Sequence, residues 1–109
     1  MKRKLVALVL VLALALAAVP VALAAVGVTG KEFKFNLTTK TVRHGKVTFK
    51  FANKGRLKHD FKIAGKKTPL VSPGKSATLT VTLKKGKSAY LCTVAGHAAA
   101  GMKGTLTVT

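Results

Sequence analysis

After residue 30, hydrophobic and polar residues alternate along most of the chain. An alternation with a period of two is typical of β-strands that bury one face and expose the other. A slip of one residue would turn each apolar set towards water, so the register of these strands is well specified. The apolar positions of the expected strands are Phe33, Phe35 and Leu37; Val47, Phe49 and Phe51; Phe61 and Ile63; Leu79, Val81 and Leu83; Tyr90 and Cys92; and Leu106 and Val108.

Glycine or proline separates these runs and predicts turns between them, because both residues favour the backbone conformations of tight turns. The expected turns lie at residues 44–46, 53–55, 64–66, 72–74 and 84–87. About six to eight short strands joined in this way predict an all-β fold, a small β-sandwich with Greek-key connections.

The N-terminal end has a different pattern. Three basic residues at 2–4 precede an apolar run from Leu5 to Val19, and Pro20 and small residues follow. This order predicts a secretory signal peptide over residues 1–24, helical over 5–19, and one domain over residues 25–109. We therefore expect an exported protein, periplasmic or extracellular. A retained membrane anchor is the alternative, since the apolar run is almost long enough to span a bilayer.

The charge balance narrows the function classes. The chain has 20 lysines and arginines against two acidic residues, Glu32 and Asp60. So basic a surface favours a soluble monomer and a partner that is acidic at its docking face. Nucleic acid fits poorly, because the chain is expected to be exported and its few aromatic residues are spaced as core positions. With only two carboxyl groups we expect no acid–base enzyme.

The C-terminal segment carries the candidate chemistry. Cys92, the only cysteine, is followed by His97 and Met102, with four residues between each pair. This spacing lets one loop bring three side chains together, and the glycine before His97 and before Met102 gives the backbone freedom to curl. His59 is the expected fourth ligand, from a separate strand. Singly, each of these residues has a simpler explanation as a core residue, so a metal-free β-sandwich stays an alternative.

The ligand types indicate which metal fits. One thiolate, one thioether and two imidazoles form a soft set that suits copper. Zinc gains little from a methionine, and iron–sulfur clusters need more thiolates. The set therefore predicts a blue-copper centre in which His59, Cys92 and His97 bind one Cu(I)/Cu(II) ion tightly and Met102 is a weak axial ligand. Such centres transfer electrons.

Three segments, Tyr90–His97, Gly101–Val108 and His59–Phe61, resemble the cupredoxins, the type I copper family of plastocyanin, azurin and auracyanin. The resemblance covers essentially the whole expected domain. It implies that the protein carries single electrons between redox partners and is not an enzyme. A copper-trafficking or copper-buffering protein on the same fold is the alternative, because fold alone does not choose between these functions.

The chain departs from its relatives at two positions. Ala95 stands where they often have proline, and Asp60 stands where asparagine is common. The resemblance implies that Asp60 accepts hydrogen bonds near Thr93 and so holds the ligand loop beside Cys92. The alternative for Asp60 is a solvated or salt-bridged acid. His44 lies in a polar turn and is expected at the surface.

Overall fold

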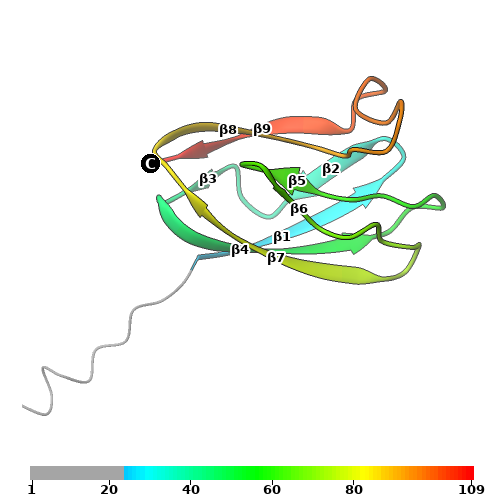
Figure 1. Cartoon of the computed structure of the whole chain (residues 1–109), viewed down its shortest axis with the longest axis horizontal. Coiled ribbons are helices and arrows are strands. Elements are labelled where there is room, and N and C mark those ends of the chain that lie inside the picture. The colour runs from blue at the N-terminus through cyan, green and yellow to red at the C-terminus, as the bar shows by residue number, and fades with distance from the viewer. Residues whose placement is uncertain (1–23) are drawn as a thin grey trace, which may run out of the picture.

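Two β-sheets face each other in the computed structural model, which describes residues 24–109 (Figure 1). One sheet has the strand order β2-β1-β4-β7 and the other the order β3-β9-β8-β5-β6. The strands are β1 (Ala24–Lys31), β2 (Lys34–Leu37), β3 (Thr41–Val42), β4 (Gly45–Asn53), β5 (Lys62–Ile63), β6 (Lys66–Lys67), β7 (Ser76–Leu83), β8 (Gly86–Leu91) and β9 (Lys103–Val108). The prediction of an all-β sandwich is confirmed.

The predicted helix over residues 5–19 lies outside the described residues, as does nearly all of the predicted signal peptide. Residues 24–109 contain no helix that is both long and apolar enough to cross a membrane.

Strand β1 was not among the expected strands. It lies between β2 and β4 and pairs parallel with β4, from Ala24 opposite Val47 to Gly30 opposite Asn53. Residues 24–109 therefore contain nine strands, more than the six to eight expected. Small and apolar residues at the start of β1 continue the composition of the preceding run, so no change of pattern marks where the strand begins.

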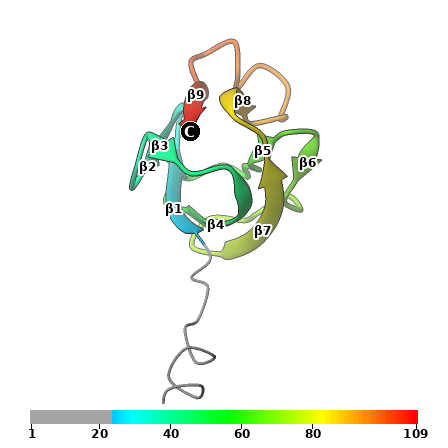
Figure 2. The same ribbon diagram turned by 90° about the vertical axis from the view of Figure 1, so that its left-hand side faces the viewer.

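An aromatic cluster fills the space between the sheets. Phe61 is fully buried, and its ring centroid lies between 5.2 and 6.4 Å from those of Phe35, Phe49, Phe51 and Tyr90. Phe35, Phe49 and Phe51 come from one sheet and Tyr90 from the other, and Figure 2 shows the two sheets face to face. Burying large aromatic side chains in edge-to-face, tilted and stacked contacts is a main source of stability in so small a domain. Since Asp60 and His59 directly precede Phe61, the cluster also fixes the backbone of the candidate site.

Phe33 does not belong to this core, contrary to the expectation from its parity with Phe35. It is 38% exposed, because β2 begins only at Lys34 and Phe33 lies in the turn between β1 and β2. The strand alternation therefore does not extend to residue 33.

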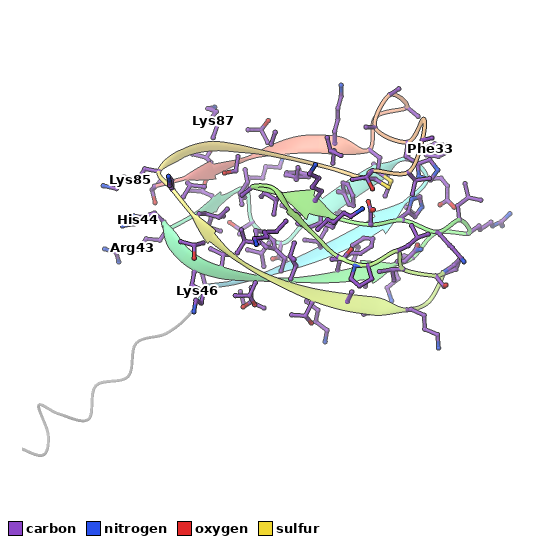
Figure 3. All side chains as sticks on the ribbon, in the orientation of Figure 1. Phe33, Arg43, His44, Lys46, Lys85 and Lys87 are labelled. Carbon is purple, nitrogen blue, oxygen red and sulfur yellow. The ribbon has the colours of Figure 1, made fainter. Side chains whose placement is uncertain are left out.

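The two ends of the sandwich carry different side chains (Figure 3). Phe33 lies at one end, beside the loop that joins β8 to β9. Arg43, His44, Lys46, Lys85 and Lys87 lie at the other end. His44 is exposed, as expected, and its Nδ1 lies 3.0 Å from the carbonyl oxygen of the C-terminal residue.

Candidate metal centre

Three potential ligand atoms meet at the end of the sandwich where Phe33 lies. The Nδ1 atoms of His59 and His97 are 3.0 Å apart, and the Cys92 sulfur lies 3.9 Å from the first and 3.6 Å from the second. Within residues 24–109, these three residues form a buried group that could hold a metal ion. The point equidistant from these three atoms lies about 2 Å from each, a normal metal–imidazole distance. The donor set and its spacing therefore fit one copper ion.

Backbone hydrogen bonds explain why the loop after β8 brings its side chains together. The Cys92 N–H donates to the Met102 carbonyl at 3.1 Å, and the Met102 N–H donates to the His97 carbonyl at 3.1 Å. Gly96 has a φ of 83° and Gly101 a φ of 116°, conformations that favour glycine. The curled loop thus places Met102, which is fully buried, next to Cys92 and His97.

His59 reaches the site from the segment between β4 and β5. It forms an isolated antiparallel bridge with Val71, with one hydrogen bond of 3.1 Å and one of 2.8 Å. His59 is not inside a strand, although a strand start was expected there, because β5 begins only at Lys62. The bridge still fixes its backbone, and its ring is fully buried.

The site is closed to solvent except at one ligand. Cys92 is 1% exposed and His97 is 8% exposed. Burial raises the pKa of the Cys92 thiol. Because a metal binds the thiolate, loading of the site releases the thiol proton.

Asp60 and Thr93 make the contact that the resemblance implied. The carboxylate accepts a hydrogen bond of 2.6 Å from the Thr93 N–H and a second, shorter one from the Thr93 hydroxyl. Asp60 is only 3% exposed. It is therefore not a solvated acid, and it joins the His59 segment to the residue that follows Cys92.

Glu32 also lies at the site, which the sequence had not indicated. Its Oε1 accepts hydrogen bonds of 2.6 Å from the N–H groups of Arg56 and Leu57. Its Oε2 lies 3.6 Å from Nε2 of His59. Desolvation acts to raise the pKa of Glu32, but these hydrogen bonds outweigh it and lower the pKa to about 2. The scarcity of acidic residues was the one feature of the sequence that could have pointed to Glu32, since both acidic residues lie at the site.

Phe33 is the second residue at the site that the sequence had not indicated, since it was expected in the core. Its ring meets the His97 ring edge-on, with 5.0 Å between centroids. It therefore covers part of the ligand that comes nearest to the surface.

Comparison with known proteins agrees with this geometry. Residues 22–109 match the family described as copper binding proteins, plastocyanin/azurin family. No curated protein sequence matches the chain significantly.

Solved structures show the same fold. Dithionite-reduced auracyanin from the photosynthetic bacterium Roseiflexus castenholzii has a TM-score of 0.68 and 21% identity, covering 82% of this chain and 99% of its own. Auracyanin A, a blue copper protein from Chloroflexus aurantiacus, has a TM-score of 0.67 and 21% identity, covering 81% and 100%. Rusticyanin from Thiobacillus ferrooxidans has a TM-score of 0.64 and 21% identity, covering 81% and 79%.

A blue copper oxidase from Nitrosomonas europaea also matches, with a TM-score of 0.65 and 18% identity, but the match covers only 39% of that longer chain. The match over residues 22–109 covers most of this sequence and includes the buried His–Cys–His group. The chain belongs to the copper-binding plastocyanin/azurin family, the cupredoxins.

Proposed function

We propose that this chain is an exported blue copper protein that carries single electrons between redox partners, with His59, Cys92 and His97 as strong ligands and Met102 as the axial ligand. The observation that carries the proposal is the buried triangle of two imidazole nitrogens and one thiol sulfur, with sides of 3.0, 3.6 and 3.9 Å. Copper bound there would supply a one-electron couple, Cu(II) + e⁻ ⇌ Cu(I).

The surrounding protein suits a carrier. Backbone hydrogen bonds to Val71 and Met102 hold His59 and Cys92, so the ligand positions need not change with oxidation state. The buried position of Cys92 excludes water from the thiolate. A trafficking protein must release its metal, and closed ligands oppose release.

His97 is the proposed route for the electron, because it is the ligand nearest to solvent. Small residues surround it on the loop, with Ala95, Ala99 and Ala100 exposed and Ala98 partly exposed. A rim of small residues lets a partner approach closely through a small contact area, as weak redox encounters do.

Basic residues that are close in sequence to residues of the site would attract an acidic partner. They are exposed and come from the end of β1, the start of β2, the segment before His59 and the start of β9: Lys31, Lys34, Lys54, Arg56, Lys58 and Lys103. The proposed domain start at residue 25 lies one residue inside β1, and the signal peptide over residues 1–24 is part of the same proposal.

Adding Cu(II) to the purified apoprotein tests the proposal. We expect one copper per chain by native mass spectrometry and an intense visible band from thiolate-to-copper charge transfer. Cys92→Ser should abolish the band, and Met102→Leu should keep it while changing the reduction potential, because the axial ligand tunes the potential.

His44→Ala is the matched control, since His44 is exposed at the opposite end and should change neither property. A colourless copper complex of the wild type would contradict a blue-copper site. Ready loss of copper to a chelator during redox cycling would favour trafficking instead.

A further inference from the structure

His59 has two ring nitrogens in different surroundings. Nδ1 faces His97 and Cys92, whereas Nε2 lies on the far side of the ring, buried and without a hydrogen-bond partner within residues 24–109. If Nδ1 binds copper, Nε2 carries the ring hydrogen and needs an acceptor. A buried donor without one is costly. The Glu32 carboxylate, at 3.6 Å, is charged and close enough to serve after a small movement.

The backbone holds this carboxylate in place. Two N–H groups, of Arg56 and Leu57, bind its Oε1 at 2.6 Å, which leaves Oε2 directed to His59. The adjoining residue is Gly55, and a Cβ there would overlap the Glu32 carboxylate. Because Gly55 has no side chain, it leaves the space that the Glu32 carboxylate occupies.

The charge distribution points the same way. The chain has only two acidic residues among 20 basic ones, and both contact the candidate site. Many lysines are exposed, but the Glu32 carboxylate is hydrogen-bonded to backbone N–H groups and lies next to His59. Its side chain is 24% exposed, so solvent only partly screens it from the ring.

We propose that Glu32 is a positioning residue for the copper centre, which accepts the Nε2 hydrogen of His59 and stabilises Cu(II) relative to Cu(I). The proposal rests on the function proposed above. A carboxylate behind a metal-ligating histidine fixes the ring tautomer and makes the ligating nitrogen more basic. Its negative charge favours the more highly charged metal state. The electron step itself moves no proton.

The test is Glu32→Gln in the full chain. Glutamine keeps the shape and one oxygen for the Arg56 and Leu57 N–H groups but removes the charge. We expect Cu(II) binding to weaken about tenfold relative to Cu(I) binding. That ratio equals a rise of about 59 mV in the one-electron potential. Competition titrations with Cu(II) and Cu(I) chelators and voltammetry measure the two quantities independently.

Two further variants test whether the change in potential comes from the position of the Glu32 carboxylate or from the net charge of the protein. Gly55→Ala keeps every charge but displaces the carboxylate, so it should raise the potential in the same direction. Thr82→Lys adds one positive charge at an exposed position of β7 opposite Lys46, at the other end of the sandwich, and should leave the potential unchanged. Thermal unfolding of each apoprotein shows whether any change is merely structural.

An E32Q potential equal to that of T82K would overturn the proposal. The wild type provides a check that needs no folded variant: in the diamagnetic Cu(I) form, the Nε2 hydrogen of His59 should give a slowly exchanging NMR signal. A rapidly exchanging Nε2 hydrogen would also overturn it. If the wild type binds no copper at all, the proposed function fails first, which is a different result.

Discussion

At the scale of single residues, the site is built from side chains that face inward and are held by backbone. Cys92, His97 and Met102 were predicted from their spacing alone, because one short loop limits how far apart they can lie. Their role as ligands is still a prediction. The contacts of Glu32 and Phe33 were not predictable, because they depend on how the β1–β2 turn packs against residues far along the chain.

The Asp60–Thr93 pair leads to a prediction at this scale. Asp60→Ala leaves the Thr93 N–H and hydroxyl without their acceptor and should lower the free energy of unfolding by about 2 kcal/mol. Asp60→Asn keeps one acceptor oxygen, and the hydroxyl can turn to accept from the new amide, so its effect should be smaller. Denaturant unfolding of the apoproteins measures both.

The copper band should broaden or shift more in D60A than in D60N, since the loop beside Cys92 loses its anchor. Thr93→Ala combined with D60A should add little further loss, because the two residues share one interaction. Equal destabilisation by D60A and D60N would show that the hydrogen bonds do not hold the loop.

At the scale of elements, the clear alternation in β4, β7 and β9 predicted those strands well. When apolar and polar residues alternate, a strand can bury only its apolar face. Strand β1 was missed because two glycines and several small residues weaken its alternation, and its place beside β4 depends on a parallel pairing of segments about 20 residues apart. Such pairing leaves no local signal in a sequence.

Gly30 on β1 allows this strand to pass close to the site. A Cβ there would lie 2.7 Å from the Phe51 ring and 3.0 Å from the Met102 methyl group. Gly30→Ala should therefore cost about 1–3 kcal/mol of stability by overpacking, and should shift the reduction potential by moving Met102. Chemical denaturation and voltammetry measure these effects.

Gly27→Ala is the control on the same strand. A Cβ at Gly27 would meet only the Thr38 side chain, on the outer side of the sheet, so it should leave the potential unchanged. A G30A protein with wild-type potential would mean that Met102 does not move, or does not tune the metal.

At the scale of the whole molecule, a net charge of +18 for the full sequence dominates long-range behaviour. Both acidic residues are engaged at the site, so exposed basic groups determine the field outside the protein. Such a field speeds encounters with negatively charged surfaces and is screened by salt.

We expect the second-order rate of electron exchange with an acidic redox protein to fall at least several-fold between low and physiological ionic strength. Stopped-flow mixing at several salt concentrations measures this rate. Exchange with an uncharged small oxidant is the control and should not depend on salt. A rate that stays constant or rises with salt would remove the role of steering.

Strand β1 runs towards the ligand loop, since Gly30 near its end lies beside Met102. Its first residue, Ala24, lies opposite Val47, and Lys46, the neighbour of Val47, lies at the pole of the domain that is remote from the ligand loop (Figure 3). Whatever precedes Ala24 joins the domain at that pole. A tether fixed in a lipid layer would thus point the His97 rim away from the layer, towards a freely diffusing partner, and removing the tether would leave that rim as accessible as before.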